Sequence, residues 1–398
     1  MSDKKDTEEL FMSSRASKPL RLGFIGGGLN SAIGSTHRIA VEMDGRFALK
    51  AGCFSAHQDI NHETGQAWGV DESRVYDDWR ALLRGEKKRL DAVVVLTPTP
   101  SHMDIVLGAM RKGFPVICEK TLATSSAEAE EIKKAVQKYN AFLAVTYNYS
   151  GYPMLREMKM MIEKGMLGKI TQIHAEMPQD GFIRVDAKGR NVSPQAWRLK
   201  DTQTLATVSL DLGTHTHHMI HFLTGSSPLE VLALQDSFGA FKQIIDNVVC
   251  VARYANHMVC QLWHSKCALG HRNGLRVRVY GTKGSARWRQ MDPEHLSYTD
   301  ITGQTRILDR ATDMDNLSAD PRYNRFKAGH PDGFIEAFAN LYYDIADCLI
   351  EFKEKGAYAS PWVFGADIAY EGLCMLEAIC RSSQNKAWEK AGAPEKRG

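Results

Sequence analysis

The chain lacks the features that mark secreted, membrane or nucleic-acid-binding proteins. Its eight cysteines are scattered without a Cys-x-x-Cys pair, and several lie inside apolar runs, so we expect buried free thiols rather than disulfides. No uninterrupted apolar stretch is long enough to span a bilayer. Lys and Arg total 50 against 47 Asp and Glu, with no basic stripe, which argues against a nucleic-acid partner. We therefore expect a cytoplasmic protein that binds neither membrane nor nucleic acid.

The length of 398 residues allows two or three domains with substantial cores. Residues 1–18 are charged and Ser-rich and lack the apolar core of a signal peptide, so we predict a disordered tail. From residue 19 onward, short apolar runs alternate with helical patterns as far as residue 147. The character of the chain changes at residue 148, where we place the boundary between a first domain, 19–147, and a second, 148–398.

The first domain is predicted to hold a doubly wound parallel sheet, because strands alternate with helices at βαβ spacing. The valines at 93–95 form a β-branched run that is typical of a strand buried on both faces. The expected strands cover 20–25, 47–54, 91–96, 116–120 and 141–146. The expected helices cover 34–42, 63–68, 77–84, 104–112 and 125–139.

The second domain is predicted to be α/β with a mainly antiparallel open sheet. Strand-like runs follow one another without regular intervening helices, at 170–176, 230–235, 247–253, 258–264 and 275–280. Helical patterns cover 153–164, 333–353 and 361–382, and the last two can pack back on the first domain. Residues 281–284 predict a turn, and residues 292–323 are polar and are expected to be irregular.

A glycine turn follows the first strand and precedes the first helix, which is the setting of a dinucleotide-binding turn. Glycines let the backbone approach a pyrophosphate, which the helix N-terminus attracts. The loop is about three residues longer than the G-x-G-x-x-G fingerprint, so a glycine-rich turn without a nucleotide is the alternative. The cofactor-binding candidates here are Gly26, Gly27, Gly28, Asn30, Ser31 and Ile33.

Two later loops add cofactor candidates. Ser55 follows the second strand, where an NAD enzyme usually has Asp or Glu and an NADP enzyme often has Arg, so the choice between NAD and NADP stays open. Prolines stiffen the loop after the third strand, which suits a wall beside a nicotinamide but also an ordinary Pro-rich turn. The candidates in that loop are Thr97, Pro98, Thr99 and His102.

Glu119 and Lys120 end the fourth predicted strand, at the sheet edge where doubly wound folds bind ligands. A lysine there can meet cofactor and substrate, and its pKa can be lowered enough for proton chemistry. The alternative is a lysine that simply leaves the strand into water.

Asp211 and His215 are four residues apart and would share one face of a helix. A histidine held by a carboxylate suits proton transfer near neutral pH. Four histidines lie between 215 and 221, which makes a metal site an alternative. At ~100° per residue, however, His215 points about 200° away from His217. We therefore predict no metal, and expect His217, His218 and His221 to be packed or exposed.

These motifs, in this order, resemble the Gfo/Idh/MocA family of oxidoreductases, which includes glucose–fructose oxidoreductase and inositol dehydrogenase. The resemblance covers about residues 20–385. It rests on the glycine turn, Gly34-x-x-His37, Thr97-Pro98-x-x-x-His102, Cys118-Glu119-Lys120, Gly165–Ile170, Asp211-x-x-x-His215 and Tyr280–Gly284. Thr121 departs from the family, which has proline after the lysine.

The resemblance implies a Rossmann domain followed by an α/β domain whose open sheet forms a homodimer or homotetramer. It implies that Lys120 bonds the nicotinamide side and the reacting hydroxyl, that His215 is the acid/base with Asp211 beside it, and that Glu119 contacts the cofactor. Asn148 and Tyr149 resemble the family's Asn-Tyr pair. With Trp197 and Arg198, they are candidates to bind a sugar or cyclitol, the alternative being ordinary loop residues.

The expected function is an NAD(P)-dependent oxidoreductase that transfers hydride between nicotinamide and a secondary hydroxyl of a sugar, sugar derivative or cyclitol, with NAD preferred over NADP. One alternative is an NAD-dependent glycosidase that oxidises a ring hydroxyl, eliminates the aglycone and re-reduces the ring. A more remote alternative is a non-catalytic regulator that senses dinucleotide or sugar.

Overall fold

The computed structural model describes residues 18–191, 194, 199, 205–311 and 317–392. The chain divides into two compact units. The first contains Met1–Glu119, Lys134–Thr146 and Phe334–Val363, and the second contains Lys120–Lys133, Tyr147–Gly333 and Phe364–Gly398. Two of the sequence-predicted substrate residues, Trp197 and Arg198, lie outside the described residues.

The first unit is built on a five-stranded sheet in the order β2-β1-β3-β4-β5, with every neighbouring pair parallel. The predicted doubly wound parallel sheet is confirmed. The central strand β3 is buried along its whole length, as its run of valines predicts. The strands are β1 Leu20–Gly26, β2 Phe47–Cys53, β3 Ala92–Leu96, β4 Val116–Cys118 and β5 Leu143–Val145.

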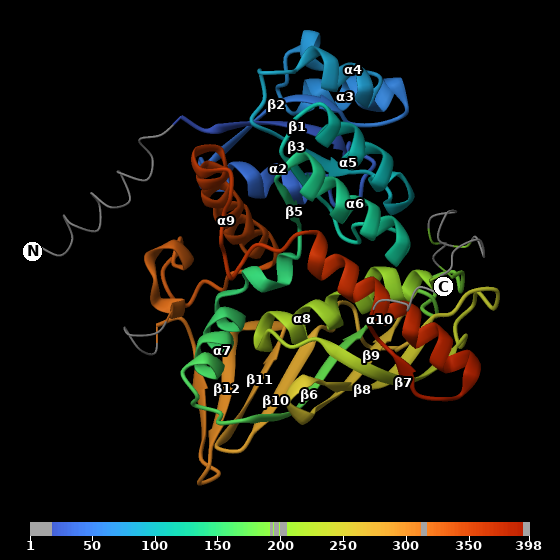
Figure 1. Cartoon of the computed structure of the whole chain (residues 1–398), viewed down its shortest axis with the longest axis vertical. Helices are drawn as coiled ribbons and strands as arrows, with labels where there is room; N and C mark the ends of the chain where they lie inside the picture. Colours follow the sequence, from blue (N-terminus) through green and yellow to red (C-terminus); the bar gives the residue numbers. More distant parts are fainter. Residues whose placement is uncertain (1–17, 192–193, 195–198, 200–204, 312–316, 393–398) are drawn as a thin grey trace, which may run out of the picture. The chain divides into compact units, whose positions relative to one another are not determined.

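Helices complete the first unit, and one of them comes from far along the chain (Figure 1). Helix α9, Phe334–Lys355, packs on α2 and contributes Phe338 and Tyr342 to the core that contains Phe24 of β1. Burial of such aromatic side chains is a main source of core stability. The other helices are α2 Gly34–Met43, α3 Gln58–Ala67, α4 Trp79–Gly85, α5 His102–Arg111 and the C-terminal part of α6 Ser126–Tyr139.

The second unit contains a nine-stranded sheet in the order β13-β12-β11-β10-β6-β9-β8-β7-β14. Every neighbouring pair is antiparallel except β6 and β9, so the predicted mainly antiparallel sheet is confirmed. The strands are β6 Ile170–Pro178, β7 Pro228–Asp236, β8 Asn247–Tyr254, β9 Met258–Ser265, β10 Arg276–Gly281, β11 Gly284–Arg289, β12 Asp292–Asp300, β13 Thr305–Leu308 and β14 Glu389–Lys390.

The prediction that residues 292–323 are irregular is wrong, because β12 and β13 lie within this segment. Both strands lie toward one end of the sheet, and β13 is exposed at three of its four positions. A strand that buries so few side chains carries little hydrophobic alternation for sequence analysis to detect.

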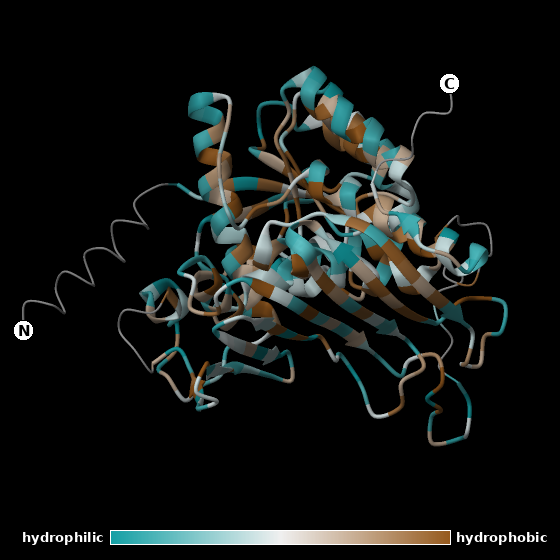
Figure 2. Ribbon diagram, turned by 60° about the horizontal axis from the view of Figure 1, so that its bottom comes forward, coloured by the Kyte–Doolittle hydropathy of each residue, from teal (hydrophilic) through white to brown (hydrophobic). Residues whose placement is uncertain are grey.

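Three helices pack on one face of the nine-stranded sheet: α7 Pro153–Glu163, α8 Thr214–Thr224 and α10 Ala366–Asn385 (Figure 1). On the opposite face, register aligns Leu234 of β7 with Val249 of β8 and Trp263 of β9. Leu234 and Val249 are 64% and 47% exposed. Apolar residues therefore occupy the open face of these strands as well as the covered face. Figure 2 shows hydrophobic and hydrophilic positions mixed along the strands of the structure.

All eight cysteines are free, and six of them are buried. In the part of the chain that the structure describes, no helix combines the length and apolar character needed to cross a bilayer.

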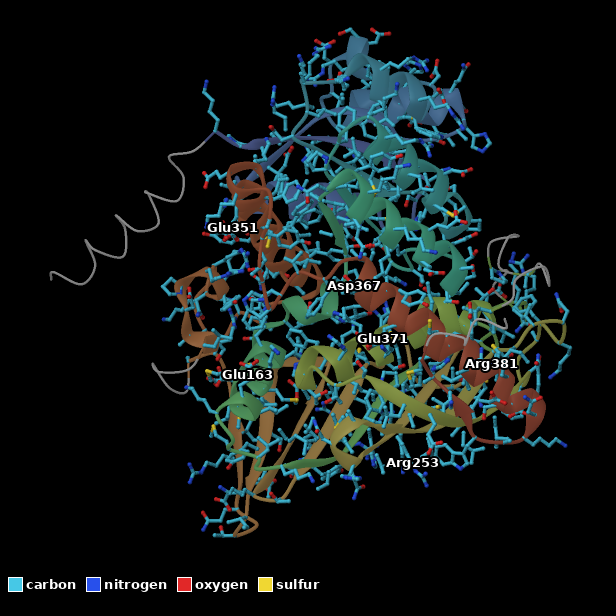
Figure 3. The ribbon with its side chains drawn as sticks, viewed as in Figure 1. Glu163, Arg253, Glu351, Asp367, Glu371 and Arg381 are labelled. Atoms are coloured by element: carbon cyan, nitrogen blue, oxygen red, sulfur yellow. The ribbon has the colours of Figure 1, made fainter. Side chains whose placement is uncertain are left out.

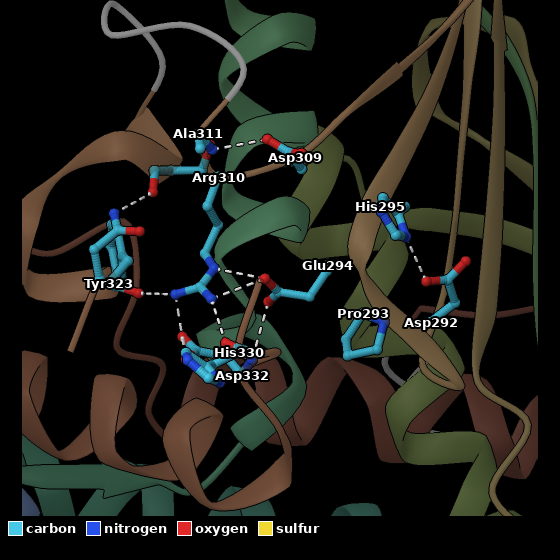
Figure 4. A network of polar contacts seen from close by, with 12 residues as sticks. Asp292, Pro293, Glu294, His295, Asp309, Arg310, Ala311, Tyr323, His330 and Asp332 are labelled. Atoms are coloured by element: carbon cyan, nitrogen blue, oxygen red, sulfur yellow. Dashed lines mark hydrogen bonds and ion pairs between the residues drawn. The ribbon is translucent and has the colours of Figure 1, made fainter. Parts of the chain in front are cut away.

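A buried guanidinium fastens the segment after β13 to β12 (Figure 4). Arg310 is 1% exposed. Its Nε donates to Glu294 Oε2 at 2.9 Å, and its Nη1 and Nη2 donate to the carbonyls of Tyr323 and His330 at 2.6 and 3.0 Å. Asp332 forms a second ion pair with the guanidinium at 3.3 Å. One side chain therefore connects β12 to the backbone at Tyr323 and His330 and to the carboxylate of Asp332.

We predict that Arg310→Met lowers the free energy of unfolding by about 3–5 kcal/mol, because it leaves the carboxylates of Glu294 and Asp332 buried without their cation. The control is Arg306→Met on the exposed face of β13, which should change stability by no more than about 0.5 kcal/mol. Urea unfolding followed by circular dichroism measures both. Equal stability of the two variants would contradict the importance of the buried network.

Candidate active site

Three of the predicted cofactor motifs meet at one edge of the parallel sheet. Register places Gly26 at the end of β1 beside Leu96 at the end of β3, and Val95 beside Cys118 at the end of β4. The amide of Glu119 donates to the Val95 carbonyl at 2.9 Å. The strand order reverses direction between β1 and β3, and open α/β sheets bind ligands in the crevice outside such a point.

The glycine turn has the backbone that a dinucleotide requires. Gly26 and Gly27 have φ of +84° and +80°, a region that other residues rarely adopt. A Cβ on Gly34 would lie 1.7 Å from the Gly27 carbonyl oxygen, so the start of α2 contacts the turn closely. The first turn of α2 holds no acidic side chain, which leaves its positive dipole end available to an anion. These features fit a pyrophosphate.

Two serines near the glycine turn have hydrogen-bond partners within the protein. Ser31 Oγ accepts from the amides of Ile33 and Gly34 at 3.3 and 3.2 Å, so it bonds the first amide of α2. Asn30 is exposed at the tip of the turn. Ser55, after β2, is half-buried and its Oγ accepts from the His57 amide at 3.1 Å.

The loop after β3 is shaped by His102, which is buried and forms a 2.7 Å hydrogen bond between its Nε2 and the Thr97 carbonyl. Ser101 Oγ donates to Thr97 Oγ1 at 2.8 Å. Pro98 is exposed and Thr99 is half-buried. His102 thus holds the loop, while Thr97, Pro98 and Thr99 form its surface.

Glu119 lies in a buried polar chain within the first unit. Its Oε1 is 3.2 Å from His37 Nε2 and accepts from the Thr146 hydroxyl, and His37 Nδ1 is 2.7 Å from the Tyr342 hydroxyl. These hydrogen bonds hold the Glu119 carboxylate in place. The residue that follows it in the sequence is Lys120. Sequence analysis included His37 in a motif but missed Tyr342, which lies far along the chain on α9.

Lys120 is held in the second unit by the π-helical turn η5, Ser209–Gly213. Its Nζ donates to the Asp211 carbonyl at 3.1 Å and to Asp211 Oδ1 at 2.9 Å. The buried Thr121 hydroxyl donates to the Leu210 carbonyl, and the Lys120–Thr121 peptide bond is cis. At the position where the family has proline, this chain therefore has a side-chain hydrogen bond to the same turn.

Asp211 does not hold His215 in the way that its spacing suggested. Its Oδ2 is instead 2.6 Å from the Nζ of Lys266, so the carboxylate lies between two ammonium groups. Because η5 is a π-turn, the α-helical spacing behind that expectation does not apply there. Sequence analysis missed Lys266, since one lysine after an ordinary strand gives no signal.

His215 is buried, and within the described part of the chain its Nδ1 has no hydrogen-bond partner. Burial and the nearby Lys120 ammonium hold the pKa of His215 well below its ordinary value. The imidazole is therefore neutral at physiological pH, which is the form that accepts a proton.

Two predicted substrate residues are adjacent in one turn, and one of them contacts His215. Tyr149, in the turn η3 Asn148–Gly151, places its ring perpendicular to the imidazole, with the ring centroids 4.6 Å apart. Asn148 is 3% exposed, and its side-chain Nδ2 has no hydrogen-bond partner in the described structure. A buried donor without a partner is costly and points to a ligand or water that is bound there.

Comparison with known proteins identifies the family. The description "Oxidoreductase family, NAD-binding Rossmann fold" matches residues 20–147, and the GFO/IDH/MocA C-terminal domain matches residues 155–287. The uncharacterized oxidoreductase YfiI of Bacillus subtilis is 33% identical over 384 residues, covering 94% of this chain and 97% of that protein. The chain belongs to the Gfo/Idh/MocA family of oxidoreductases.

Two further relatives of this Gfo/Idh/MocA protein have named ligands. An inositol dehydrogenase homolog from Azotobacter vinelandii, solved with NADH and myo-inositol, is 29% identical with a TM-score of 0.84, covering 94% of this chain and 98% of that one. Levoglucosan dehydrogenase from Pseudarthrobacter phenanthrenivorans is 26% identical over 295 residues, covering 67% of this chain and 72% of that protein. The family predicted from the ordered motifs is confirmed.

The remaining histidines of α8 have packing partners. His217 Nε2 and His221 Nδ1 lie 3.0 and 3.3 Å from the carboxylate of Glu371 on α10, which Figure 3 labels, so these two histidines share a face of α8. His218 stacks on Tyr147 with ring centroids 4.0 Å apart. Among the residues that the structure describes, no group of three or more His, Cys, Asp and Glu is arranged to hold a metal.

We predict that Thr121→Val lowers the free energy of unfolding by about 1–3 kcal/mol, because the buried Leu210 carbonyl loses its donor. The matched control is Thr171→Val, whose hydroxyl also donates to a carbonyl, that of Tyr280, but at an exposed position where water replaces it. Denaturant titration compares the two. If Thr171→Val lowers the free energy of unfolding as much as Thr121→Val does, the buried Thr121 hydroxyl contributes no more to stability than an exposed one.

Proposed function

We propose that the protein is an NAD(P)-dependent dehydrogenase that acts on a secondary hydroxyl of a sugar, sugar derivative or cyclitol. The observation that carries this proposal is the cluster in the second unit. A neutral buried imidazole, His215, lies near an anchored ammonium, Lys120. The turn η3, which contacts His215 through Tyr149, also carries the unpartnered amide of Asn148. These are the groups that deprotonate, polarise and orient an alcohol.

Each residue has a distinct role in this proposal. The Lys120 ammonium donates to the hydroxyl oxygen and stabilises the charge that develops there. His215 accepts the hydroxyl proton, and Asp211 holds Lys120 in place through Oδ1. A nicotinamide cofactor, whose proposed contacts include Glu119 and Lys120, would supply the oxidation by taking a hydride from the carbon that bears this hydroxyl. The alcohol carbon is thereby oxidised to a carbonyl.

The dinucleotide is assigned to the edge of the parallel sheet, where the residues fit a pyrophosphate and a ribose. NAD is proposed over NADP, because residues 54–60 contain no arginine for a 2′-phosphate and the Azotobacter relative was solved with NADH. Glu119 and Lys120 are adjacent in the sequence. The proposed contacts are Gly26, Gly27, Gly28, Asn30, Ser31, Ile33, Ser55, Thr97, Pro98, Thr99, His102, Glu119 and Lys120.

The substrate is assigned to the surroundings of Asn148 and Tyr149. An amide donor beside an aromatic ring suits a polyhydroxylated ring, which presents oxygens at its edge and C–H groups on its faces. The myo-inositol bound by the Azotobacter relative and the name of levoglucosan dehydrogenase support the same class.

The direct test is a screen of NAD and NADP against sugars, sugar derivatives and cyclitols. Reduced cofactor and the carbonyl product are measured together. The proposal predicts stoichiometric formation of both with at least one member of the panel. Tight dinucleotide binding without oxidation of any member would overturn it.

We predict that Lys120→Ala and His215→Ala each lower kcat by about 10²–10⁴-fold, because each removes a group that acts on the reacting hydroxyl. Nucleotide affinity, measured by titration calorimetry, should stay within a few-fold of wild type for His215→Ala, because His215 is outside the proposed dinucleotide contacts. The exposed His62→Ala serves as a control with unchanged turnover. Near-wild-type turnover in both site variants would remove the catalytic assignment.

We also propose that the protein is a homodimer or homotetramer that associates through the open face of the nine-stranded sheet. Four apolar side chains on this face are between 37% and 64% exposed: Leu232, Leu234, Val249 and Val259. An apolar patch on contiguous strands is costly in water and is typical of a protein interface.

We predict that Leu234→Glu and Val249→Glu, made together, shift the protein toward the monomer in sedimentation velocity, because they place charge in the apolar patch. Ile301→Glu is the matched control, since Ile301 is 75% exposed in the turn between β12 and β13. Its sedimentation should match wild type. An unchanged oligomer in the double variant would rule out this face.

A further inference from the structure

A second lysine lies at the site, and none of the sequence motifs includes it. Lys266 directly follows β9, and its side chain is 11% exposed. Its Nζ is 2.6 Å from Asp211 Oδ2, 3.4 Å from Gln179 Oε1 and 5.2 Å from the centroid of the Phe182 ring. A lysine is rarely buried to this degree unless an anion pairs with it.

The backbone of Lys266 is hydrogen-bonded through both its amide and its carbonyl. The position from which its side chain reaches Asp211 is therefore fixed. Its amide donates to the Asp246 carbonyl, and its carbonyl accepts from the Phe182 amide, each at 2.8 Å. The Asp211 carboxylate is therefore held through separate oxygens, Oδ1 by Lys120 and Oδ2 by Lys266. Two contacts on different oxygens determine its rotation as well as its position.

We propose that Lys266 is a positioning residue that orients Asp211 toward Lys120. By partly neutralising the Asp211 carboxylate, Lys266 also keeps His215 in its neutral form. The effect on turnover rests on the proposed dehydrogenase function. The effect on the charge of His215 does not depend on that function, and follows from the two ion pairs that hold Asp211.

Several titratable groups lie near His215, and their charges determine whether its affinity for a proton rises or falls when Lys266 is removed. Lys120 and the Asp211 carboxylate act on it most directly, the first lowering and the second raising the affinity for a proton. Tyr149 of η3 and His218 of α8 complete its neighbours, and His264 of β9 lies against η5 through Ser209. Removal of Lys266 takes away one cation and leaves Asp211 less neutralised. Both changes favour the imidazolium form of His215.

The test compares Lys266→Met with Lys266→Arg, which keeps the charge. The NMR titration of the His215 imidazole, assigned by its loss in His215→Ala, should move upward by about 1 pH unit or more in Lys266→Met and remain near wild type in Lys266→Arg. The acidic limb of kcat/KM for alcohol oxidation should move in the same direction. Lys266→Gln is measured alongside. It removes the charge but keeps a polar side chain, so it provides the test if Lys266→Met does not fold.

Lys159→Met is the matched control. Lys159 is similarly buried, with its side chain 12% exposed, pairs with Glu163 at 2.9 Å and lies 5.5 Å from the ring of Phe222 on α8. Like Lys266, it is largely buried and has a carboxylate and an aromatic ring beside it, but its Nζ bonds Glu163 and the Phe222 carbonyl in place of Asp211. Its substitution should leave the His215 titration unchanged.

The outcomes separate the two proposals. An unchanged His215 titration in both Lys266→Met and Lys266→Gln overturns the role of Lys266, whatever the activity. Equal loss of kcat/KM in Lys266→Arg and Lys266→Met with an unshifted pH profile also overturns it, because that is the mark of a merely structural lysine. Absence of alcohol oxidation in the wild type, with the titration shift present, would instead remove the proposed function and leave the electrostatic role.

Discussion

The carboxylate of Asp211 is the group on which the arrangement of the site depends. It lies between the ammonium groups of Lys120 and Lys266, at 2.9 and 2.6 Å, and all three side chains are largely buried. Charges removed from water must be paired, and loss of one partner leaves the others at high cost. A single side chain in a short π-turn therefore determines where both lysines lie. With two cations and one anion close by, the neighbouring His215 remains neutral and able to accept a proton.

The remainder of each unit supports this arrangement by fixing the backbone on either side of it. In the first unit, helix α9 places Tyr342 against His37, which in turn bonds the carboxylate of Glu119. In the second unit, the Thr121 hydroxyl bonds the Leu210 carbonyl. The residues on both sides of Lys120 are thus anchored by different elements, so the lysine has little freedom to leave its position.

Sequence analysis succeeded where a pattern is local and failed where geometry depends on contacts distant in sequence. The parallel sheet, the glycine turn and the segment ending in Lys120 each follow from a few consecutive residues, because buried strands and turns impose strict residue preferences. Lys266 and Tyr342 carry no such signal. Their importance comes from folding against Asp211 and His37. The pairing expected between Asp211 and His215 assumed α-helical spacing, whereas the chain forms a π-turn there.

The central claim is that Lys120 and Asp211 act as one unit, and a double-mutant cycle between them tests it most directly. Lys120→Met, Asp211→Asn and the double variant are compared with wild type by kcat/KM for alcohol oxidation. We expect strong non-additivity, with a coupling energy within about 0.5–3 kcal/mol, so that the double variant is little worse than the more impaired single variant. Additive losses would show that the two residues act independently and would contradict the account.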